Sequence, residues 1–287
     1  MYHEYSQEEL RAYCRSCIES LEIWARRLIH EKMTEKYGKE YIYITLSSGE
    51  SIIKKEIREH VSKMQEQNPG RFSRPVDTLF IDQIIYFLCK KEWYDLLYKE
   101  ALDFAYPQGC DEVREFLSRL VPIRNPLSHA NPISIRQAEQ AICYSHDFID
   151  GLKKYYKAKG EEQVWNVPRI IKIVDSQGNT FNNPSETHGQ SSIFKIPNPL
   201  QCGDTYSVTI EVDPAFSPTE YDIIWRTEGN EDKKFRNKTM YSNVFTEKDV
   251  AELHRIECKI VSHKAWHKYT YHDCVISLHL TVLPPLE

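Results

Sequence analysis

The first apolar stripe of the chain repeats at steps of three and four residues, which is the spacing of an amphipathic helix. It follows Ser6-x-x-Glu9, a capping box in which each side chain satisfies a backbone N–H of the first turn. The pattern predicts a helix from about Gln7 to Lys36, with Gly38 as its stop. Its length is typical of a principal helix in an all-α domain.

The same helical period continues to about residue 160. A second capping box, Ser134-x-x-Gln137, opens a helix that should end at Gly160 after a lysine-rich last turn. Further helices are expected at residues 51–67, 76–106 (divided near 90–91) and 111–120, with an ambiguous run at 39–48. We predict an all-α domain for residues 1–160.

Beyond Pro168 the apolar period changes from about 3.6 to 2, which is the period of strands with one buried face. The alternating positions are Ile171 and Ile173; Tyr206, Val208, Ile210 and Val212; Tyr221, Ile223 and Trp225; Ile256, Cys258 and Ile260; and Cys274, Ile276, Leu278, Leu280 and Val282. Short alternating strands separated by turns favour a β-sandwich over residues 161–287.

The β domain has part of the immunoglobulin pattern. Trp225 and Cys258 occupy core positions, whereas the second cysteine is missing and Ile256 stands where a tyrosine corner would be. We therefore expect an immunoglobulin-like sandwich, and an α+β multidomain protein overall.

Composition places the chain among globular proteins, with 41% hydrophobic and 28% charged residues. No apolar run approaches the ~20 residues that cross a bilayer, and the N-terminal residues lack the pattern of a signal peptide. The interpretation is a cytoplasmic protein without membrane contact.

The net charge of −5 comes from the second part of the chain, because residues 161–287 carry 13 Lys and Arg against 18 Asp and Glu. Any contact with nucleic acid should therefore be local.

Eight cysteines are too few for a disulfide scaffold, and the Cys14-x-x-Cys17 pair lies within a helical pattern. A cluster of Cys258, His263, His267, His272 and Cys274 includes histidines at ligand-like spacing. However, Cys258 and Cys274 share the parity of core residues and should point inward. We predict no metal and no cofactor.

The strongest chemical signal is Arg124-Asn125-Pro126-Leu127-Ser128-His129, which lies between helical segments and is bracketed by prolines. Proline removes a backbone donor and disfavours helix for the residue before it, so a kinked or short helical turn is expected. The arginine fork suits a phosphate, and the histidine can move a proton near neutral pH.

This motif resembles that of the HEPN superfamily, whose mark is an arginine, four to six residues, and a histidine. Asn125 matches the polar residue often found after that arginine. The phrase IRNPLSHAN, with Trp24 to Ile29 upstream, is most similar to the branch attached to a yeast transcript-surveillance endonuclease. The resemblance covers about residues 7–158.

The resemblance implies metal-independent RNA cleavage by attack of the 2′-hydroxyl, in a cleft shared by two subunits of a homodimer. Arg124 would hold the phosphate, His129 would act as general base or acid, and Asn125 would orient the histidine or donate to the phosphate. Ser128 is expected to help bind substrate. Proteins of this kind commonly act as toxins or in antiviral defence, so the sandwich could recognise a protein trigger or inhibitor.

Two alternatives stay open. Many HEPN domains are noncatalytic dimerisation or binding modules, in which case the sandwich would recognise a protein partner. The simpler structural interpretation is that Arg124 and His129 cap a broken helix and pair with nearby carboxylates such as Glu115.

Overall fold

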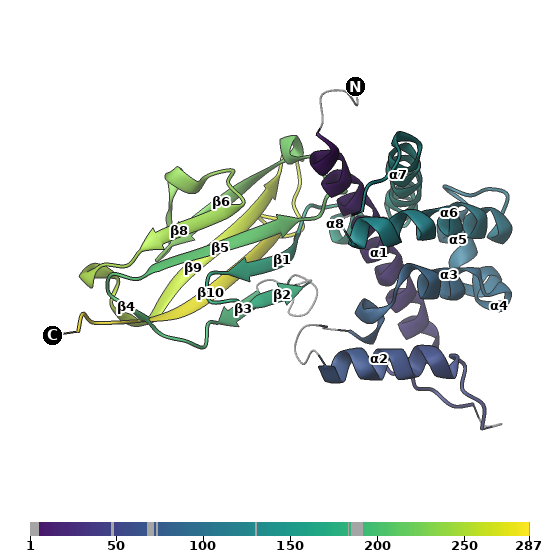
Figure 1. The fold of residues 1–287 in the computed structure, drawn as a ribbon, viewed down its shortest axis with the longest axis horizontal. Coiled ribbons are helices and arrows are strands. Elements are labelled where there is room, and N and C mark those ends of the chain that lie inside the picture. Colours follow the sequence, from purple (N-terminus) through teal and green to yellow (C-terminus); the bar gives the residue numbers. More distant parts are fainter. Residues whose placement is uncertain are drawn as a thin grey trace. The chain divides into compact units, whose positions relative to one another are not determined.

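The computed structural model describes residues 6–46, 49–67, 72, 74–129, 131–182, 184 and 192–286. The chain forms two compact units, residues 1–162 and 163–287 (Figure 1). The first, which we call the helical unit, contains helices, and the second, the β unit, contains sheets. The protein is therefore of the α+β class, with helices followed by sheets.

The helical unit is built on two long helices, and shorter ones lie between them in the sequence. Its elements are α1 (Gln7–Tyr37), α2 (Lys55–Gln67), a 3₁₀ turn (Pro75–Thr78), α3 (Ile81–Cys89), α4 (Lys91–Trp93), a π-helical turn (Tyr94–Tyr98), α5 (Lys99–Leu102), α6 (Cys110–Ser128) and α7 (Ile135–Ala158), while α8 (Glu162–Trp165) crosses the unit boundary.

Both predicted capping boxes are confirmed. Ser6 caps α1 with Glu9 completing the box, and Ser134 caps α7 together with Gln137. Gly38 ends α1 with a φ of 84°, a backbone conformation that glycine adopts without steric cost.

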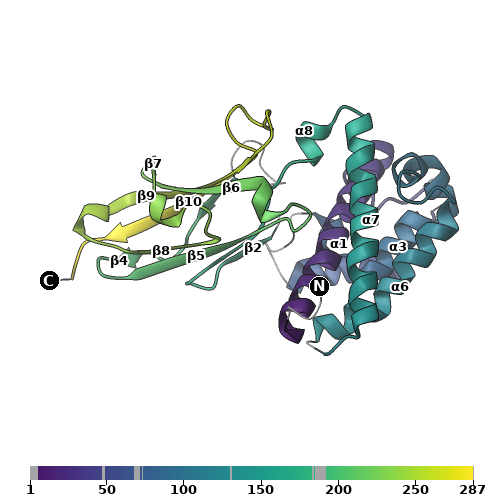
Figure 2. The ribbon, with the colours of Figure 1, turned by 90° about the horizontal axis from the view of Figure 1, so that it is seen from above.

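The core of the helical unit lies where α1 packs along α7 and against α6 and α3 (Figure 2). The side chains that fill it are fully buried: Leu21, Trp24, Leu28, Ile29, Phe87, Leu117, Leu120 and Phe148. Arg27 is also buried, with its guanidinium 5.1 Å from the ring centre of Trp24. The α1 stripe found in the sequence is thus the central packing surface.

The prediction that a helix ends near Leu120 is wrong, because α6 continues through Pro122 and Pro126 to Ser128. The prolines leave the carbonyls of residues 118 and 122 without their helical donors, and both positions are exposed, where water can bind them. Burial of Ile123 and Leu127 continues the apolar stripe and holds the last turns in place. Residues Arg124 to Ser128 of the motif therefore lie within a helix, and His129 is its C-cap.

Other expectations need smaller corrections. The helix predicted from residue 51 starts at Lys55, and the described part of the ambiguous run, residues 39–46, forms turns and one isolated bridge at Thr45. The segment predicted as helix over residues 76–106 divides at Lys90, as expected, but its first α-helix begins only at Ile81 and its last ends at Leu102. Residues 68–70, which follow the predicted helix 51–67, lie outside the described residues.

Gly151 permits close packing of α7, because an added Cβ would lie 2.6 Å from the Cβ of Ala105. Alanine normally stabilises a helix relative to glycine, but here the overlap forces the segments apart. We expect Gly151→Ala to lower the free energy of unfolding by about 1–3 kcal/mol, measured by chemical denaturation with far-ultraviolet circular dichroism. Lys154→Ala, at an exposed position of the same helix, should change stability little; equal stabilities for both variants would contradict this account.

The β unit contains two sheets. Its strands are β1 (Ile170–Asp175), β2 (Thr180–Asn182), β3 (Ser192–Lys195), β4 (Leu200–Gln201), β5 (Thr205–Val212), β6 (Tyr221–Thr227), β7 (Asn230–Glu231), β8 (Met240–Val244), β9 (Ala251–Ser262) and β10 (Cys274–Leu283).

One sheet has the order β2-β1-β5-β8 and the other the order β3-β10-β9-β6-β7, with β4 also paired to β10. The two sheets face each other (Figure 2), and the ring of Trp225 on β6 lies 5.3 Å from that of Tyr241 on β8. Trp225 also pairs in register with Cys258 of β9, and both are fully buried. The inward parity predicted for these two residues is confirmed.

The sequence pattern did not indicate β3, β4, β7 or β8. β3 and β4 run parallel to β10, a pairing made by segments far apart in the chain. In β8 only Tyr241 is buried, so the strand lacks a period of 2.

Candidate functional site

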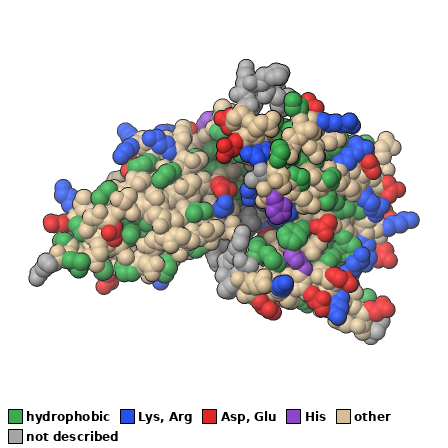
Figure 3. Space-filling model, viewed as in Figure 1, with side chains coloured by type: hydrophobic (Ala, Val, Ile, Leu, Met, Phe, Trp, Pro, Cys, Tyr) green, Lys and Arg blue, Asp and Glu red, His purple; other side chains and the backbone are tan. Residues whose placement is uncertain are grey.

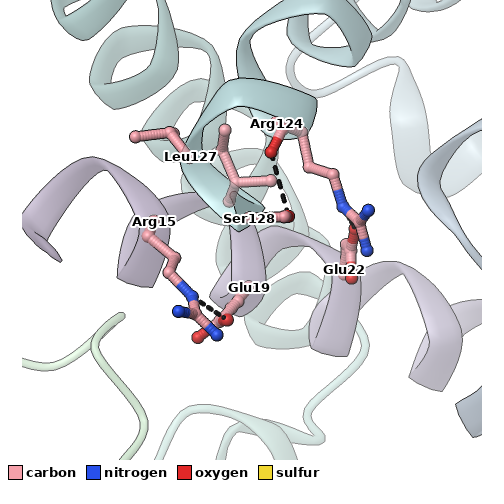
Figure 4. A pocket seen from close by; sticks show the side chains of 7 residues that line it. Arg15, Glu19, Glu22, Arg124, Leu127 and Ser128 are labelled. Carbon is pink, nitrogen blue, oxygen red and sulfur yellow. Dashed lines mark hydrogen bonds and ion pairs between the residues drawn. The ribbon is translucent and has the colours of Figure 1, made fainter. Parts of the chain in front are cut away.

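Arg124 lies on α6 at a pocket of about 260 Å³ between α1 and α6. The lining residues are Arg15, Ile18, Glu19, Glu22, Arg124, Leu127 and Ser128 (Figure 4). The Arg124 side chain is 29% exposed and points toward Glu22. Its guanidinium is therefore accessible from solvent while its position is fixed by the helix.

Two neighbours hold the Arg124 guanidinium. Its Nε lies 3.6 Å from Oε1 of Glu22, and its Cζ lies 5.2 Å from the ring centre of Phe80. Neither contact is a hydrogen bond, and no described residue accepts one from this guanidinium. Its donors are therefore available to an anion.

Glu22 is the principal residue of this pocket that the sequence analysis missed. The carboxylate is only 7% exposed, and Oε2 accepts a 2.7 Å hydrogen bond from Arg26 Nη2. Arg26 in turn donates to the Leu79 carbonyl, with distances of 3.1 Å from Nε and 2.5 Å from Nη2. Oε1 of Glu22 is buried and has no hydrogen-bond partner in the described part of the chain. A carboxylate within the α1 stripe, four residues before an arginine, was the available signal.

The motif residues divide between two sides of α6. Ser128 lines the pocket with Arg124, and its Oγ donates a 3.0 Å hydrogen bond to the Arg124 carbonyl. Asn125 and His129 are exposed and are not among the pocket-lining residues. Residues four apart share a helix face, whereas residues one or five apart do not. One copy of the chain therefore presents Arg124 and His129 on different faces.

His129 lies at the end of α6, where its own N–H bonds to the carbonyl of Pro126 at 3.1 Å. The Asn131 N–H bonds to the same carbonyl at 2.9 Å, so the chain beyond the helix is held close to it. The residue is exposed, and among the described side chains none forms a hydrogen bond, an ion pair or a ring contact with its imidazole.

Charge around the pocket is balanced. Arg15 and Glu19 form an exposed ion pair of 2.8 Å at its rim, and Glu22 offsets part of the charge of Arg124. In the view of Figure 3, acidic and basic side chains are interspersed over the helical unit. Recognition of an anion would rest on the few donors near Arg124 rather than on a broad basic surface.

The structural alternative, in which Arg124 pairs with a nearby carboxylate, agrees with the structure, but the carboxylate is not Glu115. Glu115 binds Arg119 one turn along α6, at 2.8 Å, and the carboxylate beside Arg124 belongs to α1. The local pattern suggested a partner on the same helix, whereas tertiary packing provides one from a distant segment.

The cysteine and histidine cluster of the β unit does not converge. Cys258 and Cys274 are buried, as predicted, and burial raises the pKa of the Cys258 thiol well above its usual range. His267 Nδ1 lies 3.2 Å from the buried Asp273 carboxylate. Within the described residues, no three His, Cys, Asp or Glu side chains are grouped as metal ligands.

No protein-family model matches the sequence, and neither does any curated protein. Over the described residues, none of the helices combines the length and apolar character needed to cross a membrane.

Proposed function

We propose that the helical unit is a HEPN-type domain and that the protein is a metal-independent endoribonuclease. The observation that carries the proposal is Arg124, whose guanidinium is accessible at a pocket and has no hydrogen bond to a described residue. An RNA phosphodiester matches its charge and its planar array of donors.

In the proposed reaction, the 2′-oxygen attacks the adjacent phosphorus and the bond from phosphorus to the 5′-oxygen breaks. One base removes the 2′-hydroxyl proton, and one acid protonates the leaving 5′-oxygen, giving a 2′,3′-cyclic phosphate and a 5′-hydroxyl. Arg124 would neutralise the phosphate as charge builds up. His129 would serve as base or acid, with Asn125 orienting it and Ser128 shaping the pocket wall beside the substrate.

A homodimer is part of the proposal. Arg124 and His129 lie on different faces of α6 in one chain, so a cleft that uses both needs a second copy to bring them together. Two copies would also double the number of cations at the cleft, which favours RNA binding by a unit that has no excess of Lys and Arg over Asp and Glu.

For the β unit we propose an immunoglobulin-like sandwich that binds a protein trigger or inhibitor. Support comes from the facing sheets and from the buried Trp225 beside Cys258 and Tyr241. A role as a cytoplasmic toxin or antiviral-defence effector follows from the HEPN resemblance alone.

A noncatalytic HEPN-type dimerisation and binding module is the second candidate. It is favoured by the position of His129 outside the pocket and by the Glu22 carboxylate, which gives Arg124 a structural partner. In that case the β unit would carry the recognition.

The nuclease proposal is tested with the full chain in the presence of EDTA. Two RNA substrates of the same sequence are compared, one with ribose throughout and one with a single 2′-deoxyribose. We expect cleavage of the all-ribose strand with cyclic-phosphate ends, and no cleavage at a position that carries a 2′-deoxyribose. The chelator should not reduce the rate, because no step requires a metal. Absence of cleavage, or equal cleavage of the deoxy position, would remove the nuclease and leave the binding module.

A further inference from the structure

Phe80 is a large apolar side chain that stays exposed beside the candidate site. It lies at the N-terminal end of α3 and is 39% exposed. Its own N–H bonds to Oε1 of Gln83 at 2.9 Å, which fixes the backbone at the start of the helix. A single exposed phenylalanine needs no explanation, but this one lies 5.2 Å from the guanidinium of Arg124.

A histidine from a third element completes the group. The ring of His60 on α2 lies 4.7 Å from that of Phe80, tilted by 52°. Its Nε2 lies 2.9 Å from the Thr78 carbonyl, so it donates there and the imidazole is held in one orientation. Segments far apart in the sequence thus place an imidazole, a phenyl ring and a guanidinium next to one another.

Hydrogen bonds to the backbone at the start of α3 connect Phe80 with the pocket beside Arg124. The carbonyl of Leu79, the residue before Phe80, accepts two hydrogen bonds from Arg26, and Arg26 is held by Glu22. The same buried carboxylate therefore positions Arg124 on one side and the start of α3 on the other. A ring fixed in this way loses little freedom when a ligand stacks on it.

We propose that Phe80 and His60 form a nucleobase subsite next to the phosphate held by Arg124, and that the ligand is single-stranded RNA. The inference rests on the proposed function, since it assigns the phosphate to Arg124. A base and its phosphate belong to one nucleotide, so their subsites must be neighbours. An aromatic ring stacks on any unpaired base, whereas bases in a duplex are already stacked.

The simpler role for Phe80 is to hold Arg124 through a cation–π contact, and the experiment separates the two roles. Binding is measured by fluorescence anisotropy with a labelled 2′-O-methyl oligoadenylate, which cannot be cleaved by 2′-hydroxyl attack. A second probe has the same backbone with abasic positions. The full-length wild type is compared with Phe80→Ala, Phe80→Trp and Phe104→Ala, a control at another exposed phenylalanine (44%) of the helical unit.

We expect Phe80→Ala to weaken oligoadenylate binding by about 5- to 100-fold and abasic binding hardly at all. Phe80→Trp should retain affinity, and Phe104→Ala should match the wild type. Equal losses on both probes would overturn the subsite, because Phe80 would then act only on Arg124. Unchanged affinity, or no oligoadenylate binding by the wild type, would overturn it as well. A wild type that binds through Phe80 but does not cleave RNA would overturn only the nuclease proposal.

Discussion

Replacing His129 with alanine is expected to slow RNA cleavage by about 10²- to 10⁴-fold, the usual contribution of a positioned acid or base. RNA affinity should stay close to that of the wild type, because Arg124 and its pocket remain intact. The residue is exposed at the end of α6, and its side chain has no hydrogen bond or ion pair with a described residue, so its removal should not disturb folding. Single-turnover cleavage and anisotropy on the same preparations provide the two measurements.

Arg124→Ala is the matched comparison, because it removes the proposed phosphate contact and should weaken binding as well as cleavage. Arg119→Ala is the control, since that arginine lies on the same helix in an exposed pair with Glu115. A His129→Ala protein that cleaves at the wild-type rate would contradict the assignment of acid or base. Loss of binding without loss of rate at saturating RNA would assign His129 to recognition instead.

Much of the fold could be predicted because its signals are local. Ser6 and Ser134 mark the starts of the two long helices through side chains only three residues away. Alternation at Tyr206, Val208 and Ile210 predicts a strand because each side chain faces the same core. The residues of a capping box lie within one helical turn, and the alternating residues lie within one strand, so a short stretch of sequence contains the whole signal.

The prediction failed where tertiary packing overrides a local rule. Pro122 and Pro126 indicated a helix end, but burial of Ile123 and Leu127 outweighs the missing backbone donors on the exposed side. The parallel pairing of β3 with β10 depends on segments far apart in the sequence, which a short window does not contain.

The candidate site also has one part that the sequence predicts and another that only the fold provides. The sequence identified Arg124 from its motif, but it could not provide the neighbours that define the pocket, because Glu22 and Phe80 belong to distant segments. It also grouped Arg124 with His129, whereas helical geometry turns them to different faces. Spacing in a motif thus identifies chemical groups, and the fold decides which of them can act together in one chain.

Glu22→Ala is expected to lower the free energy of unfolding of the helical unit by about 3–5 kcal/mol, because it leaves the nearly buried Arg26 without its charged partner. The pair has a 2.7 Å contact, with side chains 14% and 7% exposed, so solvent screens it little. Glu19→Ala is the control: its 2.8 Å pair with Arg15 is exposed and should contribute less than about 1 kcal/mol. Chemical denaturation followed by circular dichroism gives both values.

Glu22→Gln should lower the free energy of unfolding less than Glu22→Ala does, because an amide oxygen can still accept a hydrogen bond from Arg26, although it cannot offset the charges of the two guanidinium groups. If Glu22→Ala is no less stable than Glu19→Ala, the carboxylate does not anchor Arg26, Leu79 and Arg124, and the fixed positions argued for Arg124 and Phe80 lose their physical basis.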